Sequence, residues 1–341
     1  MNWPLISVII PTYGREEPLR NTLEDLLKQD YPAFEVLVVD QTPTHKPQTQ
    51  AYLEQLANDH KISWFRVDWA SLPGARNYAV RRASGDIILF IDDDVRLTDG
   101  FLAAHARNYL NRSEVGAVAG RVLDRMKLAE AQEGLTIEDL PPEAMDPGIF
   151  LYHLNLVHTV KAQPVLTARG CNMSFRREIF TQYGLAFDER FRGSAVREES
   201  DLCLRLRQTG WQIWYDPEAY LVHLGEETGG CHDISTRSLE YQITFYHNHF
   251  LMGFKNLTPA QFARFSLSLF QAQVLGRLSS RKSRSLPKVL ARVGSYSLGF
   301  LSTVGSLTQA MWNDGQSYSR LDDKTSINRP QNSKATIKVT P

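Results

Sequence analysis

One short segment constrains the fold of this chain more than any other: residues 87–95, Ile-Ile-Leu-Phe-Ile-Asp-Asp-Asp-Val. A short apolar run rich in β-branched residues predicts a buried strand. The strand ends in three adjacent carboxylates, Asp92, Asp93 and Asp94, and like charges at one strand end destabilise a fold unless positive charge lies among them. Because carboxylate oxygens suit Mg²⁺ or Mn²⁺, a bound divalent cation is one explanation, and a solvated acidic loop is the other.

Strand-like and helix-like patterns alternate over the residues that precede this segment. The expected strands are residues 5–10, 34–39 and 62–67, and the expected helices lie around residues 18–27, 52–56 and 73–83. This alternation predicts an α/β fold with a doubly wound, mainly parallel sheet. The strand ends then bring Thr12, Arg15 and Asp40 to the same edge as the three aspartates, which is where open α/β sheets bind their ligands.

Two common phosphate-binding motifs do not occur in the sequence. No Gly-x-Gly-x-x-Gly follows the first strand, and there is no Gly-x-x-x-x-Gly-Lys-Ser/Thr. A dinucleotide-binding fold and a phosphate-cradling P-loop are therefore both disfavoured. Phosphates at this edge would have to be bound by a metal ion and by arginine.

The composition excludes several classes of protein. The 341 residues include 38 basic and 38 acidic side chains, so we expect no nucleic-acid partner. The cysteines Cys171, Cys203 and Cys231 are few and odd in number, which argues against a disulfide framework and favours a reducing, cytoplasmic location. A zinc site built from Cys231, His232 and His223 lacks the usual paired spacing. The N-terminus does not resemble a signal peptide.

The middle of the chain adds a second group of acidic residues. We expect a strand at residues 115–120, an insertion or mobile loop at 124–164, and a compact glycine-containing segment at 167–175 followed by a short helix from residue 176. Glu198, Glu199 and Asp201 then occupy the first turn of a helix that ends at Gly210, and strands follow at 211–215 and 220–223. Acidic residues in a first turn complement the helix macrodipole, and this alone could explain them.

Six short motifs occur in an informative order. They are Ser-Val-Ile-Ile-Pro-Thr-Tyr at 7–13, Val-Val-Asp at 38–40, Gly-Ala-Arg-Asn at 74–77, Asp-Asp-Asp at 92–94, Gly-Cys-Asn at 170–172, and Glu198-Glu199 with Leu202, Arg205, Leu206 and Gly210. Together they resemble the family 2 glycosyltransferases of the GT-A fold, over about residues 5–225.

The resemblance implies an inverting transfer of a sugar from a nucleotide-diphospho-sugar to a glycan or lipid-linked acceptor, assisted by Mg²⁺ or Mn²⁺, in cell-envelope polysaccharide synthesis. The implied nucleotide-binding residues are Pro11, Thr12, Tyr13, Arg15, Asp40 at the base, Arg76 near the diphosphate, Asp92 and Asp93. The implied metal ligands are Asp94 and His223. The implied catalytic base is Glu199, preceded by Glu198. Gly170, Asn172 and Trp211 would lie in the acceptor and sugar region.

The chemistry of such a transfer requires the same parts. A metal neutralises the leaving diphosphate as a Lewis acid, and a carboxylate takes the proton of the acceptor hydroxyl. That base must lie opposite the leaving group, so a distant segment such as Glu199 suits the role. Glu199 could instead be a plain helix-start residue, His223 a structural histidine, and Trp211 a core residue rather than a sugar contact.

The sequence also departs from the family pattern. Gly14 stands where Asn is usual, Gln41 where Asp or Asn is usual, and Glu199 where Asp is usual, which extends the base by one methylene. Because there is no Gln-x-x-Arg-Trp motif and no series of long apolar segments, a processive polysaccharide synthase is disfavoured.

Two other functions share part of this pattern. A nucleotidyltransferase would use a similar sheet and metal, but the first strand leads into Pro-Thr-Tyr rather than a glycine-rich phosphate loop. A non-catalytic protein that binds nucleotide sugars would not need all of the carboxylates.

The C-terminal third, residues 226–320, is expected to be helical and separate from a catalytic domain at 1–225. Residues 293–312 carry no charge and follow a basic cluster of Arg281, Lys282, Arg284, Lys288 and Arg292. The segment has the length of a bilayer span, but polar and small residues fill about half of it. We expect an interfacial segment, with peripheral contact through 259–312 at the inner face of the plasma membrane; a helical pair packed on the domain is the alternative. Residues 321–341 are expected to be disordered.

Overall fold

The computed structural model describes residues 3–125, 138–149, 159–226, 228–230, 238–275 and 286–322. Much of the expected insertion at 124–164 lies outside the described residues. So do Cys231, His232, the basic residues at 281–284 and nearly all of the expected disordered tail.

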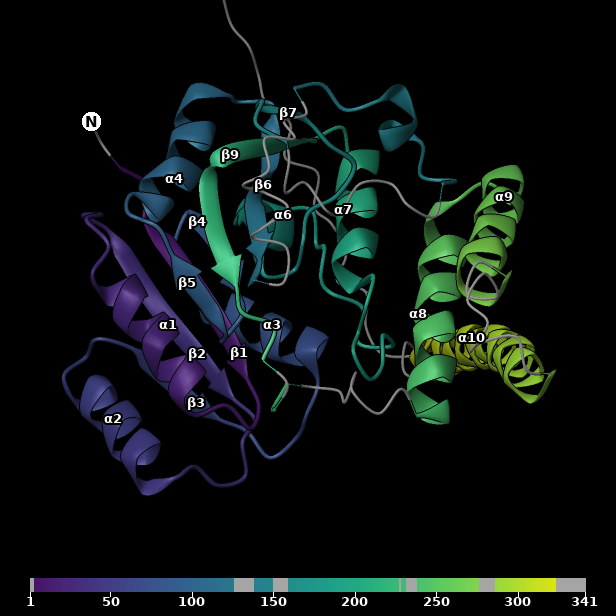
Figure 1. The fold of residues 1–341 in the computed structure, drawn as a ribbon, viewed down its shortest axis with the longest axis horizontal. Helices are drawn as coiled ribbons and strands as arrows, with labels where there is room; N and C mark the ends of the chain where they lie inside the picture. Colours follow the sequence, from purple (N-terminus) through teal and green to yellow (C-terminus); the bar gives the residue numbers. More distant parts are fainter. Residues whose placement is uncertain are drawn as a thin grey trace, which may run out of the picture.

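A single nine-stranded sheet forms the centre of the molecule (Figure 1), with the order β3-β2-β1-β4-β8-β6-β9-β5 and with β7 paired to β9. The strands are β1 (Ile6–Thr12), β2 (Phe34–Asp40), β3 (Ser63–Arg66), β4 (Ile87–Ile91), β5 (Val95–Leu97), β6 (Val115–Asp124), β7 (Gln163–Pro164), β8 (Asn172–Arg176) and β9 (Gln212–His223). Strands β1 to β4 are parallel, and β6 pairs with β9 in parallel. The expected α/β fold with a mainly parallel, doubly wound sheet is confirmed.

Helices cover both faces of this sheet and continue beyond it. They are α1 (Glu17–Leu27), α2 (Pro47–Asn58), α3 (Leu72–Val80), α4 (Phe101–Asn111), α6 (Glu178–Thr181), α7 (Glu198–Gln208), α8 (Leu239–Asn256), α9 (Pro259–Phe270) and α10 (Leu286–Asp322), with a 3-10 turn η2 (Pro142–Met145) and a π-helical turn η3 (Gln271–Leu275). In α1, a proline lies in the first turn, and Leu19, Leu23 and Leu26 form the buried face. The apolar spacing in the sequence therefore predicts which side of α1 meets the sheet.

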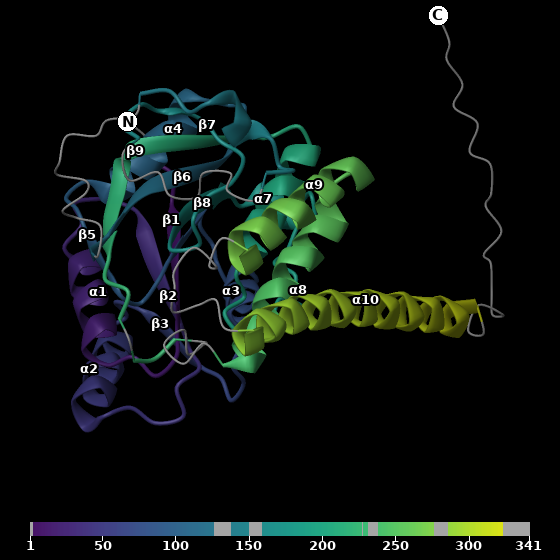
Figure 2. The same ribbon diagram turned by 45° about the vertical axis from the view of Figure 1, so that its right-hand side comes forward.

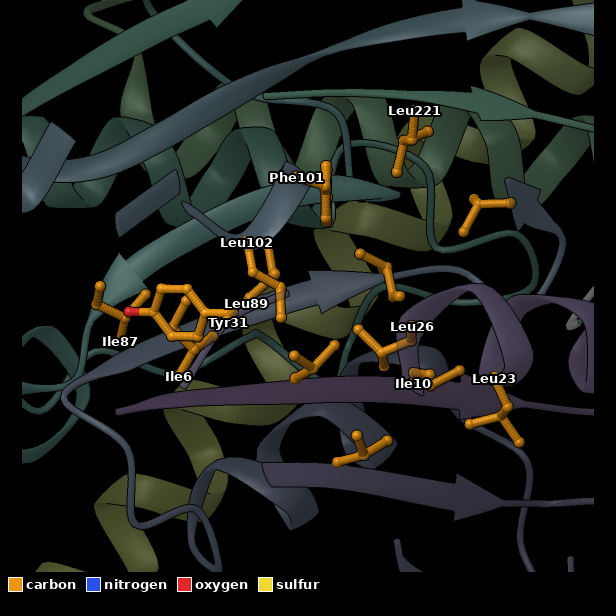
Figure 3. Packing of buried hydrophobic residues seen from close by; sticks show 14 of the residues in the cluster. Ile6, Ile10, Leu23, Leu26, Tyr31, Ile87, Leu89, Phe101, Leu102 and Leu221 are labelled. Atoms are coloured by element: carbon orange, nitrogen blue, oxygen red, sulfur yellow. The ribbon is translucent and has the colours of Figure 1, made fainter. Parts of the chain in front are cut away.

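The strand residues alternate between two apolar layers, one on each face of the sheet. Ile6, Val8 and Ile10 of β1 pack with α1, α2 and α4 (Figure 3), whereas Ile9 of β1 and Phe90 of β4 pack against α3, α6 and α7. Burial on both faces explains why these strands are mainly apolar. It also holds their carboxyl ends in one fixed line.

Strand β8 differs from what the sequence predicts. The segment expected to be a compact glycine-containing turn includes a strand that lies antiparallel between β4 and β6. Its polar residues Asn172 and Ser174 are fully buried and bind the ring of His105 on α4, with Nε2 of His105 2.9 Å from Oδ1 of Asn172 and Nδ1 2.9 Å from Oγ of Ser174. These polar partners interrupt the apolar pattern that would have indicated a strand.

The two strands expected near the end of the domain are one continuous strand, β9. Its pairing with β6 shifts register between Gly120, which pairs with Asp216, and Arg121, which pairs with Tyr220. Pro217 lies in this irregularity, and proline cannot donate a hydrogen bond to a strand ladder. The bulge therefore divides one strand into the two short patterns seen in the sequence.

The C-terminal helices share a third apolar core with α7 and the loop before it. Phe250 and Leu251 of α8 lie in this core together with Phe191 and Leu204, which belong to the loop before α7 and to α7. Helix α10 contacts α8 and then extends away from the rest of the molecule (Figure 2). The packed alternative concerned residues 293–312 of α10, of which Val293, Tyr296, Phe300 and Leu307 pack against this core. Among the helices that the structure describes, none combines the length and the hydropathy needed to cross a membrane.

Candidate active site

The carboxyl ends of five strands meet at one edge of the sheet. Strands β1, β2 and β4 end at or just before Thr12, Asp40 and the three aspartates, while β6 ends at Asp124 and β9 at His223. The predicted convergence of polar residues at this edge is present, and β6 and β9 add Asp124 and His223 to it.

Three side chains at this edge form a potential cation site. One ligand atom from each of Asp92, Asp94 and His223 lies within 4.8 Å of the other two. Nε2 of His223 is 3.4 Å from Oδ1 of Asp94 and 3.9 Å from Oδ2 of Asp92. Two carboxylates and one imidazole suit Mn²⁺, and the carboxylates also suit Mg²⁺, so the residues fit a divalent cation. Asp92 joins this cluster, although its predicted role was in nucleotide binding.

Asp93 turns away from the cluster and into the protein. Its Oδ2 accepts a hydrogen bond of 2.6 Å from Oγ1 of Thr12, and its Oδ1 lies 3.3 Å from Nε of Arg15. Burial and the neighbouring charge of Asp94 raise the pKa of Asp93 to about 7. Nη2 of Arg15 also lies 3.1 Å from Asp94, so one guanidinium offsets the repulsion between two aspartates. The roles of Thr12 and Arg15 at the nucleotide stay predictions.

His223 is oriented by a pair of residues, Asp124 and Arg169, that were not predicted from the sequence. Its Nδ1 lies 3.3 Å from Oδ1 of Asp124, and both carboxylate oxygens of Asp124 accept hydrogen bonds from Arg169, at 2.9 and 3.1 Å. Burial opposes a charged ring, but the hydrogen bonds to Asp124 and Asp94 raise the pKa of His223 to about 11. Carboxylates that hold the far nitrogen of a ligand histidine orient it toward the metal.

A signal for Asp124 was present in the sequence. It is a carboxylate at the end of a strand, as Asp40 is, but residues from 124 onward were assigned to an insertion. Strand β6 in fact continues through Asp124.

Arg76 connects the cation cluster with the start of α7. Its guanidinium pairs with the buried carboxylate of Glu198, donates to the carbonyl oxygen of Gly170 at 2.9 Å, and lies 3.7 Å from Oδ1 of Asp92. A Cβ atom at Gly170 would lie 3.0 Å from Nη2 of Arg76, so glycine allows this close approach. Gly170 thus supports Arg76, and the predicted contact of Arg76 with a diphosphate stays a prediction.

Glu199 lies at the N-terminus of α7, next to Glu198 but only partly covered. Its Oε1 accepts a hydrogen bond from Oγ of Ser200 at 3.2 Å. Burial raises the pKa of Glu199, and the charges of Arg197 and Arg76 oppose this shift. A carboxylate whose pKa is raised toward neutrality is a better proton acceptor in catalysis.

Asp40, the residue predicted to bind the base, has hydrogen-bonding partners within the protein, and its contact with a base stays a prediction. Its carboxylate is fully buried, and both oxygens are already hydrogen-bonded within the protein. Oδ1 accepts from the backbone N–H of Thr42 at 2.9 Å, while Oδ2 lies 2.9 Å from Nε2 of His45 and accepts from Nε1 of Trp64 at 3.0 Å. Asp40 therefore joins β2 to the segments on either side of α2. Pro11 is buried in β1, and Tyr13 is half-buried just beyond it.

Two residues predicted for the acceptor and sugar region have contacts within the fold, and Asn172 pairs with Ile91, next to Asp92. Asn172 is fully buried, and its amide donates 2.9 Å hydrogen bonds to the carbonyl oxygens of Arg121 and Ala219. Trp211 precedes β9 and packs against Gly116 and Tyr183, whereas His223 ends the same strand, roughly 40 Å away along it. Trp211 packs against the apolar layer that contains α3, α6 and α7, which agrees with the core alternative, and the predicted roles of both residues stay predictions.

Residues 7–184 match the model of the Glycosyl transferase family 2. The chain belongs to this family. O-antigen biosynthesis protein RfbC of Myxococcus xanthus is 31% identical over 229 residues, which are 64% of this chain and 17% of that protein. Poly(ribitol-phosphate) beta-N-acetylglucosaminyltransferase TarS of Staphylococcus aureus is 38% identical over 92 residues, which are 26% of this chain and 16% of TarS. The aligned parts are thus small fractions of both relatives.

Solved structures show the same fold. TarS 1–349 of S. aureus in complex with UDP-GlcNAc has a TM-score of 0.58 at 20% identity, with 88% of this chain and 81% of that chain covered. The mannosyltransferase PcManGT of Pyrobaculum calidifontis, in complex with GDP-Man and Mn²⁺, has a TM-score of 0.52 at 19% identity, with coverage of 93% and 85%. The chain therefore has the GT-A architecture.

The charge of His223 predicts how metal binding depends on pH. The raised pKa stabilises the metal-free fold fully below the unfolded value of about 6.5, and this contribution is lost as pH rises toward 11. Mn²⁺ needs the neutral ring, so its binding should release a proton and tighten from pH 6.5 to 8.5. Calorimetry in buffers of different ionisation enthalpy measures that release.

Two variants complete this experiment. Asp124→Asn should weaken Mn²⁺ binding by about 10- to 100-fold, the loss typical of disturbed outer-shell partners, and His223→Gln should abolish the proton release. Equal Mn²⁺ affinity at pH 6.5 and 8.5 in the unmodified protein would contradict the assignment of His223 as a ligand.

Proposed function

We propose that this protein is an inverting, metal-assisted glycosyltransferase that moves a sugar from a nucleotide-diphospho-sugar to a glycan or lipid-linked acceptor in cell-envelope polysaccharide synthesis. One observation carries the proposal: a cation site and a candidate base come from distant segments of the chain and are joined by one arginine. Asp92 of the cation cluster lies 3.7 Å from Arg76, which pairs with Glu198 beside Glu199.

The residues divide the reaction between them. Asp92, Asp94 and His223 would hold a divalent cation, which supplies Lewis-acid stabilisation of the leaving diphosphate. Glu199 accepts the proton of the acceptor hydroxyl while that oxygen bonds to the anomeric carbon and the bond to the diphosphate oxygen breaks. Attack from the side opposite the leaving group, in a single displacement, inverts the anomeric centre.

The similar proteins support this choice of substrates. The TarS and PcManGT structures hold UDP-GlcNAc and GDP-Man, the latter with Mn²⁺, and the name of TarS specifies a polymeric acceptor, poly(ribitol phosphate). We infer a nucleotide-diphospho-sugar as donor, with its base and sugar open to test.

A donor panel tests the proposed function. Calorimetry with UDP-, GDP- and dTDP-sugars, with and without Mn²⁺, should reveal one donor whose binding requires the metal. Asp94→Asn should weaken this binding by at least about tenfold, as expected for a disturbed metal site. The exposed Asp99 follows the next strand, β5, and Asp99→Asn should bind as the unmodified protein does. Binding of no donor at any metal concentration would count against the proposal.

Substitution of the base separates chemistry from binding. Glu199→Gln should lower kcat by about 100- to 10,000-fold and leave donor affinity unchanged, because only proton transfer is lost. Glu17 occupies the first turn of α1 and is exposed, so Glu17→Gln removes a comparable helix-start charge without touching the site. Sugar transfer by Glu199→Gln at the unmodified rate would exclude Glu199 as the base.

We also propose that the enzyme works at the cytoplasmic face of the membrane, with peripheral contact through residues 259–312. Exposed apolar side chains support such a contact; they are Leu267 on α9 and Leu290, Leu298, Leu301 and Val304 on α10. The first half of α10 carries Lys288 and Arg292 and no acidic residue. Apolar burial together with basic charge is how interfacial helices bind anionic lipid.

Cosedimentation with vesicles tests this contact. The double substitution Leu298→Ser and Leu301→Ser should reduce binding to vesicles that contain phosphatidylglycerol, because it removes the apolar area that would enter the interface. Leu110 is an exposed leucine on α4, and Leu110→Ser serves as the control. Failure of the unmodified protein to bind these vesicles at low salt would contradict the membrane contact.

A further inference from the structure

Helix α8 holds the loop that leads to Glu199. Three consecutive residues of α8 contact this loop. Nε2 of His247 lies 3.2 Å from the carbonyl oxygen of Arg190, and Asn248 binds both the N–H and the carbonyl oxygen of Arg192, at 3.0 and 2.8 Å. His249 reaches Arg197, the residue before α7. The loop thus follows α8 up to the point at which α7 begins.

The backbone of this loop is strained where it enters α7. Ala195 and Arg197 have φ values of 50° and 76°, in the left-handed region that side chains other than glycine disfavour. Arg197 is the N-cap of α7, and its carbonyl oxygen accepts the N–H of Asp201 at 2.9 Å. Such conformations persist only where the surroundings enforce them, and they concentrate at functional sites.

The contact between Arg197 and His249 enforces this conformation. Both side chains are buried, and Nε of Arg197 donates to Nε2 of His249 at 3.2 Å. Nδ1 of His249 lies 2.7 Å from the carbonyl oxygen of Phe245 and so carries the ring proton, which leaves Nε2 as an acceptor. Burial and the positive charge of Arg197 lower the pKa of His249 well below its usual value. The neutral ring is therefore a permanent acceptor for the guanidinium.

The position of Arg197 matters for Glu199, two residues later. The charged and titratable groups that act on Glu199 are Arg197 from the same segment, Arg76 from α3 and the Cys203 thiol from the next turn of α7. The thiol stays neutral because burial raises its pKa to about 12. Glu198 is already paired with Arg76, so Arg197 is the cation that the entry loop itself places near Glu199.

We propose that His249 is a positioning residue for the catalytic base: from α8 it fixes Arg197, and Arg197 sets both the start of α7 and the charge beside Glu199. This inference rests on the proposed function, in which Glu199 is the base. It assigns to the C-terminal helical region a part in catalysis that is separate from any membrane contact.

Two substitutions at one position test the proposal. His249→Phe keeps an aromatic ring but removes the acceptor, and should lower kcat by about 10- to 100-fold, part of what a general base contributes, with the donor KM unchanged. Without its acceptor, Arg197 should move away from Glu199, and the loss of this positive charge beside the base should move the acidic limb of the kcat–pH profile upward by about one pH unit. His249→Gln keeps an acceptor near the position of Nε2 and should restore most of kcat and the original limb.

The adjacent residue provides the matched control. Phe250 is as buried as His249, but its ring contacts Phe262, Tyr296 and Phe300 on α9 and α10. Phe250→Leu should lower the unfolding temperature without moving the pH limb. Amide hydrogen exchange should rise at residues 195–201 in His249→Phe and stay unchanged there in Phe250→Leu.

The outcomes separate this inference from the proposed function. If the unmodified protein transfers no sugar, the proposed function fails. If it does, and folded His249→Phe keeps the unmodified pH limb and the unmodified exchange at 195–201, only the role of His249 is overturned. If His249→Phe does not fold, Arg197→Gly tests the same link, because glycine tolerates the left-handed conformation. An unshifted limb in Arg197→Gly contradicts the proposal.

Discussion

The compensation of carboxylate charge at one edge of the sheet is the interaction on which this structure depends. Asp92, Asp93 and Asp94 follow a fully buried strand, and an unpaired buried charge costs several kcal/mol. Arg15 pairs with Asp93 and Asp94. His223 lies beside Asp92 and Asp94. The segments that supply these cations come from β1 and β9, so the folded sheet itself assembles the site.

A single arginine extends this compensation to the other half of the site. Arg76 is almost completely buried, yet it reaches the carboxylate of Glu198, the carbonyl oxygen of Gly170 and the vicinity of Asp92. Its charge therefore acts on the cation cluster and on the start of α7 at once. A change of charge at the cation cluster therefore alters the electrostatics at the start of α7 through Arg76. This shared partner couples the groups proposed for leaving-group stabilisation and proton transfer.

The sequence predicts the sheet edge well and individual side chains less well. Strand periodicity placed Asp92 to Asp94 at a strand end. This position follows from the local sequence and does not depend on the partners of the three side chains. The orientation of each side chain depends on distant residues. Asp40 accepts a hydrogen bond from Trp64, which lies 24 residues later, and Asn172 is bonded to His105, 67 residues earlier. Such long-range pairings leave no local pattern, so the sequence does not reveal that both side chains have partners within the protein.

The same reasoning explains what was missed. Asp124 and Arg169 bind each other across 45 residues, and part of the chain between them lies outside the described residues. Arg197 and His249 are 52 residues apart, and the sequence around His249 predicts only a helix. Their roles follow from contacts between elements, which periodicity cannot supply.

The contacts of α8 with the loop before α7 limit where segments of two family members can be joined in a chimera. Lys255 of α8 lies 2.6 Å from Asp188 in that loop and 2.8 Å from Asp201 in α7. A recombination point near residue 225 would separate these partners. Asp201 is fully buried, so its carboxylate would lose the charge of Lys255 without gaining contact with water. A chimera that is to keep this catalytic half intact must therefore inherit α8 from the same parent and place its junction beyond Asn256.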